Sequence, residues 1–384
     1  MVKRSLASQF APVLLGSLTG AVLLGCANKG YSPLESPRDA TAIQTGKPSS
    51  PEMVSLPQEP APVVGLDNID AGPPPVSRAG TNTGHTPPAT AQFGRGWIPL
   101  RTWAERSGLS KPERIAAGSA VAFRIPTRNG WCKLTIGTRL AHWNGVAVWL
   151  GFAPQMIQGE PHINALDAEK TLTPLTEPVE KFSLPRRTIV LDPGHGGSDS
   201  GTRDAQNHFE KDFALDWALR TERLLTNAGW KVFLTRRTDV DVPLAERVSF
   251  ADRVQADLFI SLHFNSAFPQ TAPSGIETYC LTPAGMPSTL VREFADDGRI
   301  IFPNNAWDAA NMAWAHRIHR ALLTQTAAHD DGVKRARFMG VLRYQNRPAV
   351  LVEGGFLSNA QDASDINSPA YRQSLAQALA QGLK

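Results

Sequence analysis

The chain has 384 residues, of which 42% are hydrophobic, and its formal net charge at pH 7 is +4. This length accommodates two modest domains with additional tails, and the composition is ordinary for a globular protein. Lys3 and Arg4 lie in a segment that we expect to be removed. Without them the net charge falls to about +2, which is too small to indicate a nucleic-acid partner.

Residues 1–25 have the three parts of an export signal. Two basic residues supply the positive start, and residues 11–24 form an apolar run that is too short to span a bilayer. The run ends in "LLGC", which resembles the lipobox of bacterial lipoproteins and implies that Cys26 is acylated and anchors the chain to a membrane. An ordinary signal peptide with an unrelated cysteine is the alternative. Because Ala27 follows instead of aspartate, the resemblance favours an outer-membrane lipoprotein that faces the periplasm.

Residues 26–92 are predicted to be a disordered tether. Twelve of the 30 prolines fall between residues 31 and 90, where Ser, Thr and Gly are common and hydrophobic periodicity is absent. Such a segment buries too little apolar surface to offset the entropy that ordering would cost. We therefore expect it to connect a lipid-anchored Cys26 to the folded part of the chain.

Residues 93–180 are predicted to form a small strand-rich domain. "GWIPLRTWAERSGL" indicates a short strand and a helix, and the apolar runs that follow are separated by turn signals such as Arg128-Asn129-Gly130. The pieces "WIPLRTWAE", "LTIGTRLAHWNG" and "LTPL" resemble the copper-amine-oxidase N-terminal-like module, an accessory of bacterial envelope proteins. That resemblance implies no copper chemistry, and we interpret His142 and His162 as surface or packing residues.

Residues 181–384 alternate between strand and helix patterns. Strands are predicted at 188–192, 231–236, 257–265, 276–281 and 348–356, and helices at 207–228, 243–254, 307–328 and 368–383. Strands separated by helices of this length indicate an α/β fold, here a three-layer αβα sandwich with a largely parallel twisted sheet. Active sites in such sheets collect at the carboxyl ends of the strands.

Four polar residues occur near strand ends or a helix start. His195 follows "IVLDPG", His263 lies in "FISLHFNS", Glu353 follows "AVLV", and Glu210 opens the first long helix. Two histidines and a carboxylate are the ligand types of a catalytic zinc ion, which leaves one position for water. We therefore predict that His195, Glu210 and His263 bind one Zn²⁺ and that Glu353 is the general base and acid.

Each of these residues also has an ordinary explanation. His195 would be a surface residue in a glycine turn, His263 a satisfied core histidine, and Glu210 a carboxylate favoured by the helix dipole. If there were no metal site, all of these ordinary explanations would have to hold at once. The glycines around His195 are expected to leave the rim of the site open for substrate. Asp192 is expected either to hydrogen-bond a ligand histidine or to brace the loop.

The remaining histidines are weaker candidates. His208 could replace Glu210 as a ligand, but residues two apart point to different sides of a helix. His316 and His319 share a helix face without a carboxylate motif and are expected to be solvated or partly packed. The two cysteines beyond residue 26 lie in different predicted domains, so a disulfide between them is not favoured.

The C-terminal half resembles a known enzyme family. Seven motifs carry the resemblance, in family order: "IVLDPGHGGSDSG", the glutamate of "FEKDFAL", "RTDVDVPLAERVSFAD", "ADLFISLHFNS", "GIETYCL", "GVKRARFMGVLR" and "PAVLVEGGFLSN". Residues 186–384 thereby resemble the catalytic domain of the zinc-dependent N-acetylmuramoyl-L-alanine amidases, the Amidase_3 family. The resemblance places the metal ligands on His195, Glu210 and His263 and the catalytic glutamate on Glu353. It implies cleavage of the amide between N-acetylmuramic acid and L-alanine in peptidoglycan, during wall remodelling or daughter-cell separation.

The sequence departs from the family pattern at three places. Ser200 stands where proline is usual and Gly354 where a bulkier residue is common, and neither is a proposed ligand. The third departure is the long connection Thr282–Asp308. In some relatives an insertion near this point blocks the metal until an activator protein displaces it, and the alternative is a substrate flap. Its polar, glycine-containing composition favours the flap, and Glu293 is the candidate if a carboxylate does plug the metal.

Two further functions stay open at this stage. One is a non-catalytic envelope protein that binds peptidoglycan, against which the four intact site residues argue because a binding module has no need of a base. The other is a zinc hydrolase of a different cell-wall amide, which the ligand types alone do not exclude.

Overall fold

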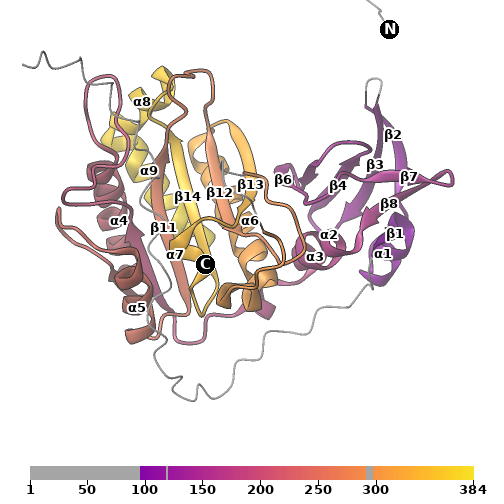
Figure 1. The fold of residues 1–384 in the computed structure, drawn as a ribbon, viewed down its shortest axis with the longest axis horizontal. Coiled ribbons are helices and arrows are strands. Elements are labelled where there is room, and N and C mark those ends of the chain that lie inside the picture. The colour runs from indigo at the N-terminus through magenta and orange to yellow at the C-terminus, as the bar shows by residue number, and fades with distance from the viewer. Residues whose placement is uncertain (1–95, 118–119, 291–296) are drawn as a thin grey trace, which may run out of the picture. The chain divides into compact units, whose positions relative to one another are not determined.

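The computed structural model describes residues 96–117, 120–290 and 297–384. The expected signal peptide, the tether and Cys26 lie outside the described residues, as does Glu293. We call residues 96–182 the N-terminal region and residues 188–384 the C-terminal region (Figure 1). Within the described ranges, no helix combines the length and the apolar character needed to cross a membrane.

The C-terminal region contributes six neighbouring strands to one sheet, in the order β10-β9-β11-β14-β12-β13. Their bounds are β9 (Thr188–Pro193), β10 (Lys231–Leu234), β11 (Leu258–Asn265), β12 (Ile276–Leu281), β13 (Asp330–Ala336) and β14 (Ala349–Phe356). Strands β10, β9, β11 and β14 run parallel to one another, whereas β12 and β13 run the opposite way. The predicted α/β fold is therefore confirmed, with a mixed sheet.

Helices cover both faces of these strands. One face carries α4 (Glu210–Asn227), α6 (Asp308–Thr326) and α9 (Pro369–Gly382), and the other carries α5 (Leu244–Arg253) and α7 (Gly340–Arg343); α8 (Ala360–Asn367) follows β14. Each face has its own buried apolar cluster, the larger under α4, α6 and α9. Because helices bury both faces, β9, β11 and β14 read as nearly continuous apolar runs.

The direction of each strand fixes where the loops emerge. The carboxyl ends of β9, β11 and β14 form what we call the site end of the sheet, which is the upper end in Figure 1, where α8 follows β14. Since β12 is antiparallel to β14, its last residue Leu281 lies at the opposite, far end. The connection Thr282–Asp308 therefore begins and ends at the far end.

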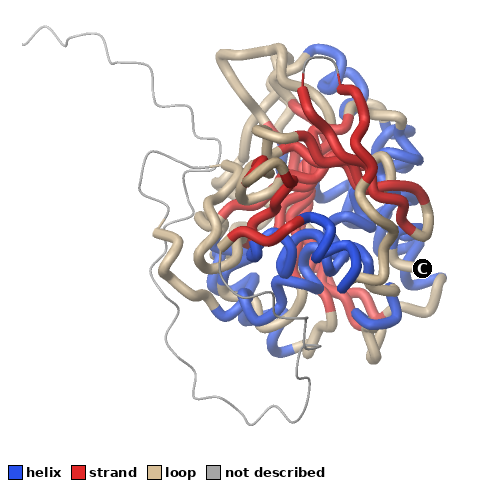
Figure 2. Tube along the Cα trace, turned by 90° about the vertical axis from the view of Figure 1, so that its right-hand side faces the viewer, coloured by secondary structure: helices blue, strands red, loops and turns tan. Residues whose placement is uncertain are grey.

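The N-terminal region is strand-rich, as predicted. Its elements are β1 (Trp97–Pro99), α1 (Leu100–Arg106), β2 (Glu113–Ala117), β3 (Ala120–Thr127), β4 (Gly130–Thr135), β5 (Leu140–Trp143), β6 (Val146–Trp149), β7 (Gln155–Ile157), β8 (Glu160–Asn164), α2 (Ala165–Asp167), a π-helical turn (Ala168–Leu172), α3 (Thr173–Thr176) and a 3₁₀ turn (Val179–Phe182). A second 3₁₀ turn (Pro303–Trp307) belongs to the C-terminal region, where it precedes α6. Strands β1, β8 and β7 form a small separate sheet. Figure 2 views the molecule from the side of these N-terminal strands.

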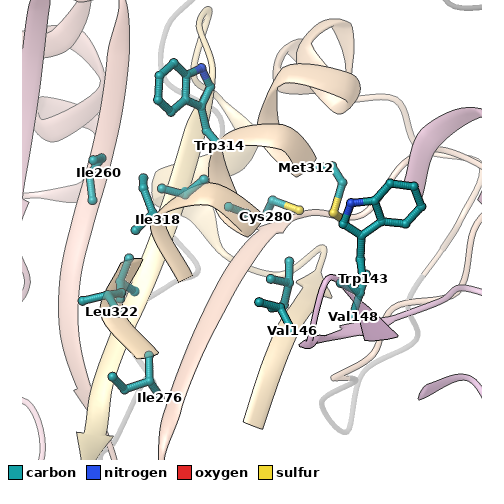
Figure 3. Close-up of a cluster of buried hydrophobic side chains, with 14 of the residues drawn as sticks. Trp143, Val146, Val148, Ile260, Ile276, Cys280, Met312, Trp314, Ile318 and Leu322 are labelled. Carbon is teal, nitrogen blue, oxygen red and sulfur yellow. The ribbon is translucent and has the colours of Figure 1, made fainter. Parts of the chain in front are cut away.

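Strands β2 to β6 extend the main sheet beyond β13. They form an antiparallel meander, and β6 lies parallel to β13, so that the sheet has 11 described strands. Trp143, Val146 and Val148 pack with Met312 and Cys280 across this junction (Figure 3). Asp330 Oδ2 accepts a hydrogen bond from the backbone nitrogen of Ala147, at 2.8 Å. The two regions thus share one core, and Cys132 and Cys280 are both buried free thiols.

Candidate metal centre

The loop after β9 carries the first candidate ligand. Pro193 ends the strand, and His195 takes a left-handed backbone conformation with φ of 59°. A residue other than glycine adopts this conformation at a cost, and such positions concentrate at functional sites. The His195 side chain is only 9% exposed, so the interpretation as a surface residue of a glycine turn is wrong.

Three predicted ligands meet at one point. His263 projects from β11, His195 from the loop after β9, and Glu210 from the first residue of α4. Glu210 Oε1 lies 2.8 Å from His263 Nδ1 and 3.2 Å from His195 Nε2. Candidate ligand atoms of the three residues all lie within 4.8 Å of one another. The structure therefore brings together the residues that the sequence singled out.

Glu210 is held by more than its position at a helix start. Its Oε1 accepts a hydrogen bond from the backbone nitrogen of Phe264, at 3.1 Å, and its Oε2 accepts one from that of Thr202, at 3.0 Å. The side chain is buried and turned toward the two histidines. A helix-dipole role alone would leave it in solvent, so the side chain is placed for contact with the cluster.

The cluster has the chemistry of a metal site. Nε2 of His195 is buried and forms no hydrogen bond with any described residue, and two imidazoles with one carboxylate are a common donor set for zinc-type ions. A Cβ atom at Gly194 would lie 2.2 Å from the His263 ring, and one at Gly201 would lie 2.5 Å from Glu210 Oε2. These two glycines thus make room for the clustered side chains, and the expected opening of the rim for substrate stays a prediction.

Asp199 orients His195, and the sequence reasoning missed it. The Nδ1–H of His195 donates to Asp199 Oδ2 at 2.9 Å, which directs Nε2 toward Glu210. Burial acts to raise the pKa of Asp199, but the hydrogen bond and charge of His195 together with the bond from the Gly201 backbone outweigh it, and the pKa lies below its ordinary value. The available signal was the position of Asp199 four residues after the histidine in the same glycine turn.

Asp192 braces the loop and forms no described bond to a histidine ring. It accepts hydrogen bonds from Ser261 Oγ at 2.7 Å and from Arg247 Nη1 at 2.6 Å. Arg247 in turn binds the carbonyl oxygen of His195, at 2.8 Å. Of the two roles considered for Asp192, the structure shows the second.

Glu353 lies beside the cluster. Its Cα is the register partner of His263 in the parallel pair of β11 and β14. The side chain is 2% exposed, and Oε2 has no hydrogen-bond partner among the described residues. Burial, followed by the charges of Glu210 and Glu277, raises the pKa of Glu353 well above its ordinary value. A buried carboxylate without a partner is costly and is typical of a group kept for chemistry.

A second buried carboxylate, Glu277, was not singled out in the sequence. It lies directly opposite Glu353 in the antiparallel pair of β12 and β14, and Lys334 and Asn265 donate to its two oxygens. Burial raises the pKa of Glu277 to about 7, against the opposing effect of Lys334. Two neighbouring carboxylates thus lie beside the cluster, and among the described residues Glu277 pairs with Lys334 whereas no ion pair is formed by Glu353.

The other histidines lie away from the cluster. His208 is exposed, and its Nδ1 donates to Asp204 Oδ2 at 2.8 Å. The expectation that His316 and His319 are solvated or partly packed is wrong, because both are buried. His316 donates to the carbonyl oxygen of Trp143 at 3.1 Å. The two buried histidines, His316 and His319, join α6 to neighbouring strands rather than forming a site.

The connection Thr282–Asp308 is described only at its flanks, because residues 291–296 lie outside the described ranges, and both roles considered for it stay predictions. Its described flanks are seated at the far end, where Arg337 Nη2 donates to the carbonyl oxygens of Pro283 and Met286, at 2.9 and 2.8 Å. Arg139 of the N-terminal region donates to the carbonyl oxygen of Ser288, at 3.1 Å. The described flanks therefore lie at the end of the sheet opposite the metal cluster, because β12 runs antiparallel to β14.

The C-terminal half of the chain matches a known protein family. Residues 189–384 match the Amidase_3 family, described as N-acetylmuramoyl-L-alanine amidase. The chain is 28% identical over 274 residues to the N-acetylmuramoyl-L-alanine amidase AmiC of Escherichia coli O6:H1, covering 61% of this chain and 65% of that protein. It is 36% identical over 196 residues to the amidase LytC of Bacillus subtilis strain 168, covering 51% and 34% respectively. The chain thus spans between a third and two thirds of the length of these relatives.

Two solved structures are also similar in sequence to part of the chain. The catalytic domain of CwlV, an N-acetylmuramoyl-L-alanine amidase from Bacillus (Paenibacillus) polymyxa var. colistinus, is 30% identical with a TM-score of 0.43. The match covers 51% of this chain and 95% of that one. The amidase AmiC2 of Nostoc punctiforme has the same identity and TM-score, with 51% and 94% coverage.

Proposed function

The chain belongs to the Amidase_3 family of N-acetylmuramoyl-L-alanine amidases, and on that premise we propose that it is a zinc-dependent peptidoglycan hydrolase. The bond cleaved is the amide between the lactyl group of N-acetylmuramic acid and L-alanine. The observation that carries the proposal is the convergence of His195, Glu210 and His263 beside a buried carboxyl group, Glu353, that lacks a partner among the described residues.

Each residue has a defined task in this proposal. His195, Glu210 and His263 hold the zinc ion, which when bound polarises the substrate carbonyl and lowers the pKa of water. Asp199 fixes the His195 ring so that Nε2 is directed toward Glu210 and would be free to hold the ion. Glu353 accepts the proton of the attacking water and returns it to the nitrogen of the departing L-alanine. Its raised pKa makes the carboxylate a stronger proton acceptor than an exposed glutamate.

The alternative of a non-catalytic peptidoglycan-binding protein has less support. A module that only binds peptidoglycan gains nothing from Glu353, whose desolvated carboxyl group has no compensating bond from a described residue. Hydrolysis of a different cell-wall amide uses the same ligand set, so product identity is what separates that alternative from ours.

The N-terminal motif supports a proposal about the cellular location of the chain. We propose that Cys26 is acylated and that the chain is an envelope lipoprotein facing the periplasm, at the outer membrane, with residues 26–92 as the tether. Wall remodelling or daughter-cell separation is the proposed role, with an activator protein as a further proposed partner. Loss of labelled palmitate from a Cys26→Ala variant in the native cell would support the anchor, and equal labelling of both chains would refute it.

The decisive experiment uses the full chain and purified peptidoglycan, with and without a chelator. Mass spectrometry should detect free stem peptides that begin with L-alanine, with release lost on chelation and restored by Zn²⁺. Release of peptides cut at another amide would support the alternative hydrolase. Zinc-loaded protein that binds the wall and releases nothing would support either the binding module or a missing activator. Adding cell extract would distinguish these two, because only a missing activator would restore release.

A further inference from the structure

Two buried arginines hold the loop that carries His195. Arg236 follows β10 and Arg247 lies in α5, and their side chains reach the loop from different elements. Together they donate to the carbonyl oxygens of three consecutive residues, Pro193, Gly194 and His195. These three carbonyl oxygens thus accept hydrogen bonds from side chains, whereas backbone carbonyls ordinarily pair within sheets or helices.

Arg247 contacts both the strand and the ligand. Its Nη1 donates to Asp192 Oδ1 at 2.6 Å and to the Pro193 carbonyl at 2.9 Å, and its Nη2 donates to the His195 carbonyl at 2.8 Å. Its Nε donates to the Val242 carbonyl, at 2.9 Å. The planar fork therefore spans the turn from the end of β9 to the left-handed residue, a reach that a lysine ammonium would not reproduce.

Arg236 joins the loop to the second ligand. Its Nε donates to the Pro193 carbonyl at 3.0 Å, and its Nη2 donates both to the Gly194 carbonyl at 2.7 Å and to the Lys211 carbonyl at 2.8 Å. Lys211 directly follows Glu210 in the first turn of α4. One guanidinium group thus fixes the distance between the chain segments that carry His195 and Glu210.

The hydrogen bonds of Arg236 and Arg247 meet a structural requirement of the candidate metal site. His195 has an unfavourable backbone conformation, and three ligands from separate elements must meet before an ion can be held. We propose that Arg236 and Arg247 are positioning residues that preset this geometry in the metal-free protein, so that metal affinity depends on them. The proposal depends on the proposed metal site but not on hydrolysis, since it concerns binding of the ion alone.

The competing explanation is that these arginines only stabilise the fold. The two explanations predict different results for a substitution that removes the planar guanidinium group but keeps the positive charge. Arg236→Lys and Arg247→Lys do this, and Arg237→Lys is the matched control because Arg237 is exposed and pairs with Glu222. Asp192→Asn is a further variant, which removes the buried carboxylate charge while leaving both guanidinium groups in place.

The experiment measures Zn²⁺ affinity of the full chain by competition with a chromophoric chelator, with far-UV circular dichroism as the check on folding. Both Arg236→Lys and Arg247→Lys should bind Zn²⁺ about 10- to 100-fold more weakly while remaining folded, and Arg237→Lys should be unchanged. Asp192→Asn should lose less affinity than Arg247→Lys. The visible spectrum of bound Co²⁺ should change in the first two variants only.

Affinity within twofold of the parent chain in both folded lysine variants would overturn the proposal. So would failure of both variants to fold with Zn²⁺ present or absent, because the arginines would then serve the fold. Neither outcome involves peptidoglycan, so a failure here is distinct from a failure of the proposed hydrolysis.

Discussion

Glu353 is the register partner of His263 across the parallel strands β14 and β11, which places the carboxyl group beside a candidate metal ligand. On its other side Glu353 faces Glu277 of β12, which is paired with Lys334. The row from His263 to Glu277 crosses three neighbouring strands at the site end of the sheet. The proposed proton carrier thus lies one strand from His263, whereas the other two candidate ligands come from the loop after β9 and from the first residue of α4.

Replacing Glu353 by glutamine should abolish turnover without loss of metal. The variant keeps the shape of the side chain but removes proton transfer, which contributes about 10²- to 10⁴-fold to such reactions. Metal content by elemental analysis should equal that of the parent chain, and the rate of stem-peptide release should fall within that range. A rate within threefold of the parent would exclude Glu353 as the proton carrier.

Replacing His195 or His263 by alanine should lower the bound metal per chain. Each change removes one of the two histidine donors that converge on Glu210. His208→Ala is the control, because His208 is exposed and bonded to Asp204, and its metal content should stay unchanged. Full metal occupancy in both ligand variants would mean that the ligand set is different.

Replacing Asp199 by alanine should weaken metal binding about 10-fold or more, because His195 Nδ1 loses the acceptor that orients the ring. Asp199→Asn should lose less, since the amide oxygen still accepts a hydrogen bond. Isothermal titration with Zn²⁺ of both variants provides the comparison. Equal affinities in the alanine, asparagine and parent chains would show that the ring is oriented by other contacts.

The buried His316 should make the fold sensitive to acid. Burial lowers the pKa of His316 to about 4, so between pH 6.5 and 4 the unfolded chain binds its proton more readily than the folded chain. The free energy of unfolding therefore falls as the pH drops through this window, by about 3 kcal/mol from this residue.

His316→Gln can still donate to the Trp143 carbonyl but does not titrate. Urea unfolding at pH 7, 5 and 4 should show a smaller acid loss in this variant than in the parent chain. Other groups that titrate in the same range affect both chains equally. Parallel pH dependences would contradict the assignment.

Replacing Glu293 by glutamine should leave metal affinity and hydrolysis unchanged. The described residues on either side of it, Leu290 and Asp297, belong to flanks seated at the far end of the sheet. A carboxylate that plugged the metal would instead give a variant with higher activity and tighter Zn²⁺ binding. Parallel assays of Glu293→Gln and the parent chain, with the same peptidoglycan preparation, separate these outcomes.

The fold class and the candidate ligands could be predicted from local patterns in the sequence. Apolar strands buried on both faces, helices between them, and polar residues at strand ends are local patterns, and each is visible within about ten residues of chain. His195, Glu210, His263 and Glu353 were identified in this way, and the structure brings them together. The family motifs pointed to the same four positions.

The tertiary structure alone decided what lies around those residues. The reversed direction of β12 sends the connection after it to the far end, and an apolar strand pattern carries no information on direction. Likewise Arg247 meets the His195 carbonyl from 52 residues away, and β6 pairs with β13 across a longer separation. Such contacts depend on which surfaces pack together once the core forms, so no local period or spacing encodes them.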